Sequence, residues 1–282
     1  MLRGMRIEFS KMQGLGNDFL VFDAPPAGAG HLLDSDKLRA LADRHTGIGF
    51  DQALVLEAPR NGEARAFYRI FNADGSEVEQ CGNGVRCIAA LLYARKPALG
   101  RKFTLDSPGG VVAANVREDG LVSVDMGVPN FLPAALPMLA ASESMLYPLT
   151  VAGTRVEVGA VSMGNPHIVL RVADVDTAPV AELGPALEHH PSFPKRTNVG
   201  FMQIVDRGHI RLRVFERGVG ETLACGTGAC AAVAIGRRQG LLDADVTVDL
   251  KGGRASVSWQ GADQHLWLTG PATTVFTGSI EI

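Results

Sequence analysis

Two copies of one segment decide the fold of this chain: FNADGSEVEQCGNGVRCIAALL (residues 71–92) and FERGVGETLACGTGACAAVAIG (residues 215–236). When the copies are aligned at an offset of 144 residues, Cys81 falls on Cys225 and the glycines of the two C-G-x-G motifs coincide. Self-similarity at one offset is the signature of a duplicated structural unit. The segment therefore predicts two related halves, each organised around one C-G-x-G loop.

Two weaker matches recur in the same order along the chain. Residues 46–52 match residues 197–203 at four of seven positions, and residues 16–21 match residues 164–169 more loosely. Each half would hold about 145 residues, which is a normal domain size. We expect the halves to face each other across a pseudo-twofold axis, with the active site in the cleft between them and the two cysteines on its opposite sides.

The residues around the repeat predict an α+β fold. An Ala-rich, wholly apolar run follows each C-G-x-G motif and is typical of a buried helix, and short runs rich in Val, Ile and Phe predict strands. Helices are expected at residues 85–93, 229–236, 36–44 and around 180–190. Strands are expected at residues 6–10, 19–23, 53–56, 66–71, 121–126, 167–172, 201–205, 209–214, 256–260 and 266–269. Each half would then be a mixed, mainly antiparallel sheet wrapped around a central helix.

The repeat also places the domain boundaries. We expect residues 1–125 to form the N-terminal half and residues 126–270 the C-terminal half. The last segment, residues 271–282, would return to the N-terminal half.

The composition narrows the class of partner. The chain has 282 residues, with 27 basic and 30 acidic side chains and a net charge of −3. Without a long run of one sign, this balance argues against nucleic acid or a membrane surface and favours a small molecule. The sequence shows neither a signal peptide nor an apolar stretch of transmembrane length. We therefore predict a cytoplasmic protein.

The C-G-x-G loops suggest a chemistry. A helix N-terminus carries unpaired N–H groups and a partial positive charge, so each loop can bind a carboxylate or phosphate. Cys81 and Cys225 stand where this field stabilises a thiolate, whereas Cys87 and Cys230 fall inside the apolar helices and are expected to be structural. Two thiols at one carboxylate suit the inversion of an α-carbon, because one removes a proton and the other returns one to the opposite face. The sequence has no metal or pyridoxal phosphate motif, so no cofactor is expected.

At these motifs the chain resembles the diaminopimelate epimerase family. The matching blocks are KMQGLGNDFLVFD, RHTGIGFDQ, FNADGSEVEQCGNGVRC, SMGNPH, TNVGF and FERGVGETLACGTGAC, with a typical ending at GPATTVFTG. The resemblance implies a cofactor-independent isomerase that interconverts LL- and meso-diaminopimelate, in the synthesis of lysine and peptidoglycan precursors. It also implies a homodimer. Phe276 stands where many members have Tyr, in a segment linked to dimer contacts.

The resemblance also implies roles for individual residues. Cys81 and Cys225 match the two catalytic cysteines, with Cys81 as the thiolate that takes the proton from the LL substrate. His167 and Glu216 match residues that tune the pKa values of these cysteines. The residues that match the substrate-binding set are Asn17, Gln52, Asn72, Gly82, Asn83, Asn165, Asn198, Glu216, Arg217, Gly226 and Thr227.

Other interpretations remain open at this point. The asparagines could be turn residues beside glycine, and Arg217 with Glu216 could be a surface pair. The chain could also be another two-half isomerase, such as a proline racemase-like enzyme or a double-bond isomerase, or a non-catalytic binder or thiol redox sensor. The many amides argue against a small ring substrate, because such a substrate has no second zwitterionic end. The repeat-related Glu77 and Glu221 are expected to cap or brace the loops rather than to act in catalysis.

Overall fold

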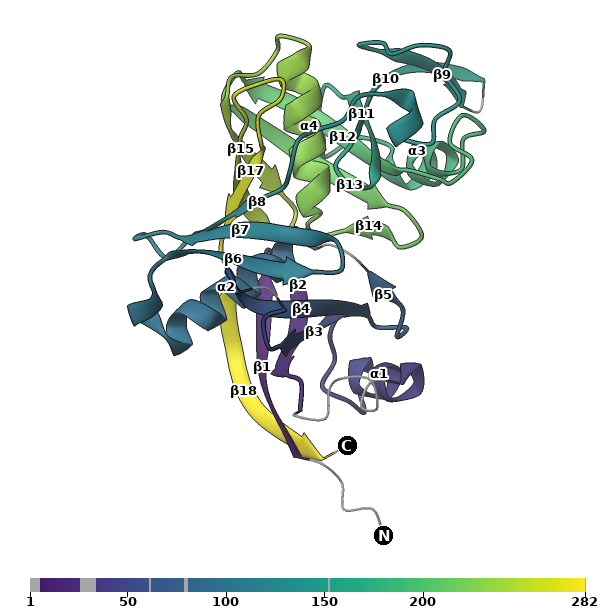
Figure 1. The fold of residues 1–282 in the computed structure, drawn as a ribbon. Coiled ribbons are helices and arrows are strands. Elements are labelled where there is room, and N and C mark those ends of the chain that lie inside the picture. The colour runs from purple at the N-terminus through teal and green to yellow at the C-terminus, as the bar shows by residue number, and fades with distance from the viewer. Residues whose placement is uncertain (1–5, 26–33, 61, 79–80, 152, 282) are drawn as a thin grey trace. The chain divides into compact units, whose positions relative to one another are not determined.

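The computed structural model describes residues 6–25, 34–60, 62–78, 81–151 and 153–281. Its contacts divide the chain into two compact units (Figure 1). One unit consists of Met1–Val124 together with Gly270–Ile282, and the other is Asp125–Thr269. Within the described residues, no helix is long and apolar enough to cross a membrane.

The first unit is built on a sheet in which only two neighbouring pairs are parallel. The pairs β2–β3 and β4–β6 run parallel, and β18–β1, β1–β2, β3–β4, β6–β7 and β7–β8 run antiparallel. The short β5 (Glu77–Val78) pairs with the end of β4. The other strands are β1 (Arg6–Gly14), β2 (Asn17–Asp23), β3 (Gln52–Glu57), β4 (Ala64–Asn72), β6 (Lys102–Ser107), β7 (Gly110–Val116), β8 (Val122–Asp125) and β18 (Thr273–Glu281).

The second unit repeats this pattern strand for strand. The pairs β11–β12 and β13–β15 run parallel, and β9–β10, β10–β11, β12–β13, β15–β16 and β16–β17 run antiparallel. The short β14 (Gly220–Thr222) pairs with the end of β13, as β5 does with β4. The other strands are β9 (Tyr147–Val151), β10 (Thr154–Ser162), β11 (Pro166–Arg171), β12 (Asn198–Asp206), β13 (His209–Glu216), β15 (Asp245–Leu250), β16 (Gly253–Ser258) and β17 (Trp267–Gly270). The predicted α+β fold with two equivalent halves is confirmed.

A central helix follows each C-G-x-G motif. Helix α2 (Gly82–Arg95) contacts β1, β2, β7 and β18, and α4 (Gly226–Arg238) contacts β10 to β13 and β16, so each sheet wraps around its helix. Every residue of α4 from Gly228 to Gly236 is buried, which an Ala-rich helix allows because its surface is narrow and carries no charge until the last turn. The remaining helical segments are α1 (Ser35–Ala42), α3 (Val180–Glu188) and the short η2 (Pro97–Leu99) and η3 (Pro133–Ala135).

Helices α1 and α3 make equivalent crossovers between parallel strands, α1 from β2 to β3 and α3 from β11 to β12. Asp34 caps α1 by accepting a hydrogen bond from the Lys37 backbone N–H at 2.7 Å. The expected extension of this helix to Arg44 was wrong by two residues. The Asp43 carboxylate accepts the N–H groups of His45 and Thr46 and turns the chain after Ala42.

The repeat-related glutamates hold the short hairpins that lead into the C-G-x-G loops. Arg69 on β4 makes a two-pronged ion pair with Glu77, with both N···O distances at 2.7 Å. Arg213 on β13 makes the same pair with Glu221, at 2.6 and 3.0 Å. In both cases the hydrogen bonds from arginine hold the pKa of the glutamate below its usual range. Each ion pair thus joins a short strand to its neighbour, β5 to β4 and β14 to β13.

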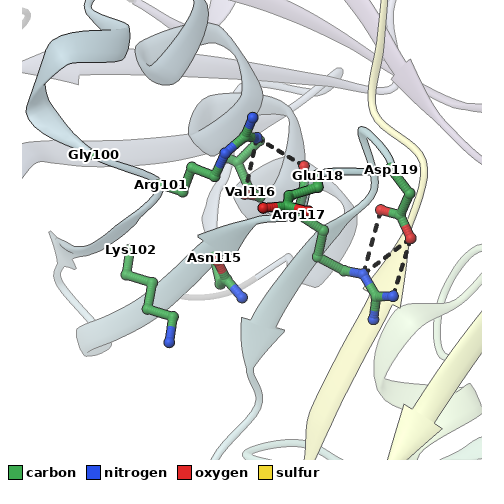
Figure 2. Close-up of a pocket in the computed structure, with 8 residues that line it drawn as sticks. All are labelled: Gly100, Arg101, Lys102, Asn115, Val116, Arg117, Glu118 and Asp119. Carbon is green, nitrogen blue, oxygen red and sulfur yellow. Dashed lines mark hydrogen bonds and ion pairs between the residues drawn. The ribbon is translucent and has the colours of Figure 1, made fainter.

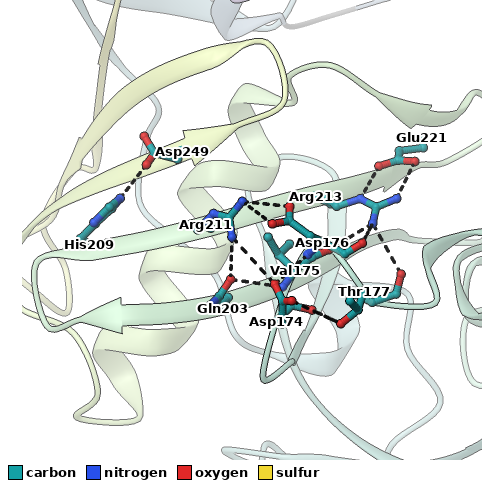
Figure 3. A network of polar contacts seen from close by, with 11 residues as sticks. Asp174, Val175, Asp176, Thr177, Gln203, His209, Arg211, Arg213, Glu221 and Asp249 are labelled. Atoms are coloured by element: carbon teal, nitrogen blue, oxygen red, sulfur yellow. Dashed lines mark hydrogen bonds and ion pairs between the residues drawn. The ribbon is translucent and has the colours of Figure 1, made fainter.

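The Arg213–Glu221 pair belongs to a row of ion pairs along one face of β13 (Figure 3). Arg211 donates to the carboxylate of Asp176 at 2.8 and 2.9 Å, and His209 contacts Asp249 at 2.7 Å. Because the three basic residues alternate with buried neighbours, they share the solvent side of the strand. These contacts link β13 to β14, to β15 and to the loop that holds Asp176.

We expect Glu221→Gln to lower the free energy of unfolding by about 0.5–1 kcal/mol at pH 7, because it removes a partly exposed, two-pronged ion pair. A glutamate whose folded pKa is lowered contributes stability above its unfolded pKa and loses it as the pH falls. The difference between wild type and variant should therefore shrink below about pH 4. Urea unfolding at several pH values measures this, with the exposed Glu157→Gln as the control. A constant difference at all pH values would contradict the role of the charge.

Candidate active site

In the first unit, the predicted site residues gather at one end of the sheet. Asn17 opens β2 and Gln52 opens β3, while Asn72 closes β4. Because β2 and β3 are parallel and β4 runs against β3, these three positions coincide at the same end. The Gln52 side-chain Nε2 donates to the side-chain Oδ1 of Asn72 at 3.0 Å. Among the described residues, the buried Gln52 Oε1 has no hydrogen-bond partner.

The second unit gathers its own set at the equivalent end. Asn165 directly precedes β11, Asn198 opens β12 and Glu216 closes β13, and these strands have the same relative directions. Helix α4 begins directly after Cys225, and Arg217 directly follows β13. Each unit thus brings its predicted residues together around one cysteine at one helix N-terminus.

Cys81 is the N-terminal cap residue of α2 and is partly buried. Its backbone is extended, with φ −149° and ψ 103°, so the chain turns into the helix at Gly82. The Cys81 thiol donates to Asn17 Oδ1 at 3.7 Å. The buried Asn83 side chain donates to the same oxygen at 3.3 Å. One carbonyl oxygen of Asn17 therefore serves both residues of the C-G-N-G loop.

Cys225 has a different environment at the equivalent position. It caps α4 with a similar extended backbone, at φ −114° and ψ 110°, but it is buried. Burial and the neighbouring Glu216 carboxylate, which accepts a hydrogen bond from the thiol, raise the pKa of Cys225 well above its usual range. The Thr227 hydroxyl lies 3.6 Å from the sulfur, and the Thr222 hydroxyl donates to Glu216 at 2.5 Å. The thiol is thus the favoured form of Cys225.

His167 reaches Cys225 only through an intermediate hydroxyl. Its Nε2 lies 3.0 Å from both Asn165 Oδ1 and Thr227 Oγ1, and Thr227 in turn contacts the thiol. Complete burial, with a smaller contribution from Arg217, lowers the pKa of His167 to about 3. The imidazole is therefore neutral. Because an amide oxygen only accepts, Nε2 carries the proton, and the deprotonated Nδ1 is buried without a hydrogen-bond partner among the described residues.

Asn198 and Arg217 differ sharply in how their side chains are engaged. The Asn198 amide is buried, donates to the Pro166 carbonyl at 2.8 Å and accepts the Arg217 backbone N–H at 3.0 Å. It ties three strands together at their ends. The Arg217 side chain is exposed and makes a long hydrogen bond, 3.4 Å from Nη1 to the Lys195 carbonyl. Arg217 is therefore the more available of the two for an anionic ligand.

An ion-pair network that the sequence pattern did not predict contacts Asn17. Asp51 accepts a hydrogen bond from the Asn17 side chain at 2.9 Å and is itself bound by Arg44. Both residues lie in the quoted block RHTGIGFDQ, where their spacing of seven residues looks like ordinary surface charge. Only the fold brings them to Asn17.

A surface depression of about 780 Å³ lies elsewhere in the first unit (Figure 2). Its arginines are engaged: Arg101 donates to the carbonyls of Val116 and Arg117, and Arg117 pairs with Asp119. None of the predicted site residues lines it. Among the described residues, no cluster of three or more His, Cys, Asp or Glu side chains could hold a metal ion.

The fold is that of an epimerase of known structure. The hydroxyproline epimerase from Agrobacterium vitis superposes with a TM-score of 0.69 over 98% of this chain and 93% of that one, at 16% sequence identity. The similarity of sequence is more specific. The family model described as diaminopimelate epimerase matches residues 9–132 and 159–275.

Full-length relatives agree with that match. The diaminopimelate epimerases of Nitrosomonas europaea and Thioalkalivibrio sulfidiphilus are 55% and 56% identical to this chain, and each alignment covers 99% of the chain and 100% of the relative. The chain belongs to the diaminopimelate epimerase family.

We expect His167 to make stability depend on pH. Its folded pKa lies far below the unfolded value of about 6.5, so below that value the unfolded state binds a proton that the folded state excludes. Stability should fall by about 2 kcal/mol from pH 7 to pH 5 on account of this residue alone. His167→Gln keeps a side-chain N–H donor but cannot titrate, so urea unfolding should show a smaller fall for the variant. The exposed His45→Gln is the control, and equal falls for wild type and His167→Gln would contradict the neutral, buried imidazole.

Proposed function

We propose that the chain is a cofactor-independent diaminopimelate epimerase, an isomerase that inverts one α-carbon to interconvert the LL and meso forms. The observation that carries the proposal is the repeated cap: in each unit a cysteine stands at the N-terminus of a buried helix. Full-length similarity to diaminopimelate epimerases identifies the substrate. The product would serve lysine and peptidoglycan precursor synthesis, in the cytoplasm, where free thiols persist.

The helix N-termini would bind the carboxylate next to the reacting carbon. The N–H groups of the first helical turn have no partner within the helix, and those of Gly82–Asn83 and Gly226–Thr227 stand at these positions. When the α-proton leaves, negative charge spreads onto the carboxylate. Donors already aimed at that charge stabilise the transition state without reorganising.

The two thiols would divide the proton transfer. In the LL-to-meso direction, the Cys81 thiolate takes the α-proton and the Cys225 thiol delivers its own proton to the opposite face of the carbanion. The burial of Cys225 and its contact with Glu216 support this assignment, because both favour the protonated thiol that an acid needs. After turnover Cys81 is the thiol and Cys225 the thiolate, so the return reaction runs in the other direction with the roles exchanged.

The remaining polar residues would hold the distal end of the substrate. Exposed Arg217 offers a guanidinium to the distal carboxylate, and the unpartnered Gln52 Oε1 offers an acceptor to an ammonium. Asn72, Asn165 and Asn198 complete this set of amides. A site with so many polar groups discriminates strongly against substrates that lack a second zwitterionic end. This favours diaminopimelate over the small ring substrates of proline racemase-like enzymes.

We also propose a homodimer formed through β18. Five consecutive residues of this strand, 273–277, are exposed, and they include Val275 and Phe276 at 57% and 47% exposure. Among the described pairings β18 bonds only to β1, and Phe276 packs edge-on against Phe9 with ring centroids 6.0 Å apart. A long strand with exposed apolar side chains is a natural surface for a second copy.

We expect Cys81→Ala and Cys225→Ala each to abolish the exchange of the substrate α-proton into D₂O, since inversion needs both a base and an acid. Cys87→Ala and Cys230→Ala should retain turnover, because these thiols are fully buried in the helices. Mass spectrometry of LL-diaminopimelate incubated with each variant measures the deuterium gained. Loss of turnover in a folded Cys87→Ala variant would contradict the assignment of Cys81 and Cys225 as the reacting thiols.

For the dimer, we expect Phe276→Lys to sediment as a monomer, because it places a charge in an apolar contact. Leu139→Lys makes the same change at a 70% exposed residue of the other unit and should leave the dimer intact. Analytical ultracentrifugation distinguishes the two states. A wild-type monomer, or a dimeric Phe276→Lys variant, would contradict this interface.

A further inference from the structure

We propose that Asp51 is a positioning residue that fixes the direction of the Asn17 amide and thereby favours the protonated form of Cys81. The inference rests on the proposed function only in that Cys81 is taken as a reacting thiol, and the protonated form that it favours is the one Cys81 holds after the LL-to-meso step. The arrangement itself lies wholly within the first unit.

Asp51 makes three hydrogen bonds at the entrance of β3. Its Oδ2 accepts from the Asn17 amide nitrogen at 2.9 Å and from the Asp18 backbone N–H at 3.1 Å. Its Oδ1 accepts from Arg44 Nη2 at 2.8 Å. The carboxylate thus faces the nitrogen end of the Asn17 side chain.

This contact decides which way the Asn17 amide points. A carboxylate only accepts, so the amide NH₂ must face Asp51 and the carbonyl oxygen must face the other way. That oxygen lies 3.7 Å from the Cys81 sulfur and 3.3 Å from Asn83 Nδ2. An acceptor held there receives a hydrogen bond from a thiol but opposes a thiolate. A flipped amide would do the reverse, because its NH₂ would donate to the thiolate.

Asp51 is itself held by a second carboxylate and two cations. Asp18 Oδ1 accepts the Asp51 backbone N–H at 2.9 Å, and Arg44 forks onto both oxygens of Asp18. The nearly buried Lys11 donates to Asp18 Oδ2 at 2.6 Å. Burial opposes ionisation of Asp18, but the hydrogen bonds from Arg44 and Lys11 outweigh it and hold its pKa well below the usual range. Asp18 therefore stays ionised next to Asp51, and Arg44 bridges the two carboxylates.

The second unit has no carboxylate at the position equivalent to Asp51. In the repeat alignment Asp51 corresponds to Met202, a buried apolar residue of β12. The Asn165 amide, which corresponds to Asn17, donates instead to the Thr227 hydroxyl and accepts from His167. The Asp51 contact therefore acts on one cysteine of the pair and distinguishes Cys81 from Cys225.

Among the described residues, the buried Tyr68 on β4 and Cys87 on α2 interact electrostatically with Cys81. Burial raises the pKa values of Tyr68 and Cys87 to about 12, so neither titrates where Cys81 is expected to. Among the charged residues of this network, Asp51 is the one that accepts a hydrogen bond from the Asn17 side chain. The pH response of Cys81 should therefore report the Asn17–Asp51 contact.

The test is the pH dependence of Cys81 alkylation by iodoacetamide, followed by peptide mass spectrometry in a Cys225→Ala background. The thiolate is the reactive form. We expect Asp51→Ala to lower the midpoint by about one pH unit, because the freed amide can turn its NH₂ toward the thiolate. Asp23→Ala, which removes a carboxylate paired with Arg95 on the same unit, should leave the midpoint unchanged. The readout needs no turnover, so it stands apart from the identity of the substrate.

Two further variants separate amide direction from charge and from folding. Asp51→Asn can still accept from Asn17 through its oxygen and should keep a midpoint near that of wild type. Asn17→Ala should lower the midpoint by itself, and adding Asp51→Ala to it should change nothing further. The proposal is overturned by an unchanged midpoint in Asp51→Ala or Asn17→Ala, by an equal shift in Asp51→Asn, or by a shift that persists when Asn17 is already absent.

Discussion

The close packing of one narrow helix inside each sheet is the constraint on which the rest of the structure depends. A Cβ atom added at Gly84 would lie 3.0 Å from Leu54, and one added at Gly236 would lie 2.5 Å from Leu242. At Gly228 the added atom would meet Val214 at 3.0 Å and the Cys225 sulfur at 3.3 Å. The second glycine of each C-G-x-G motif is therefore required by the sheet as well as by any ligand. Because the helix can approach this closely, its capping cysteine is held at the end of the sheet where the polar residues gather.

The same backbone arrangement supports two different sulfur environments. At Cys81 the neighbour is an amide oxygen, fixed from behind by a charged network. At Cys225 the neighbours are a carboxylate and a hydroxyl, the latter held by a neutral histidine. Duplication thus conserved the helix N-terminus that stabilises charge, while the side chains around each thiol diverged.

The sequence predicts those parts of this structure that depend on patterns within a short stretch of residues. The duplicated segment specified two equivalent sheets and the start of each central helix, since glycine spacing and an Ala-rich run are local features. The pattern did not predict β18, because residues 273–277 are exposed on both faces and show no alternation. It also did not predict β10, whose exposed start gives way to five consecutive buried residues. β18 takes its place from long-range pairing with β1, whereas β10 forms local hairpins with β9 and β11.

The same distinction applies to the site. The cysteines and the amides could be chosen from motifs, because each lies at the end of a strand or the start of a helix. Their partners could not. Two of these partners, Lys11 and Asp51, reach the site only because the fold brings β1, β2 and the start of β3 together. A third, Thr222, reaches Glu216 only because β14 folds back onto β13. Asn198 was predicted to contact the substrate, but its side-chain amide also makes hydrogen bonds with backbone groups of two neighbouring segments.

In the proposed two-base inversion, such asymmetry would be useful. The reaction needs one thiolate and one thiol at any moment, and two identical thiols at one site would titrate as a coupled pair with no preference for which of them holds the proton. Different neighbours break this degeneracy. The Asn17 oxygen and the Glu216 carboxylate both favour a thiol, but the first depends on the direction of one amide and the second on a buried charge. The protonation state of each sulfur can therefore be set separately in each unit, without altering the helix N-termini that would hold the substrate carboxylate in the proposed mechanism.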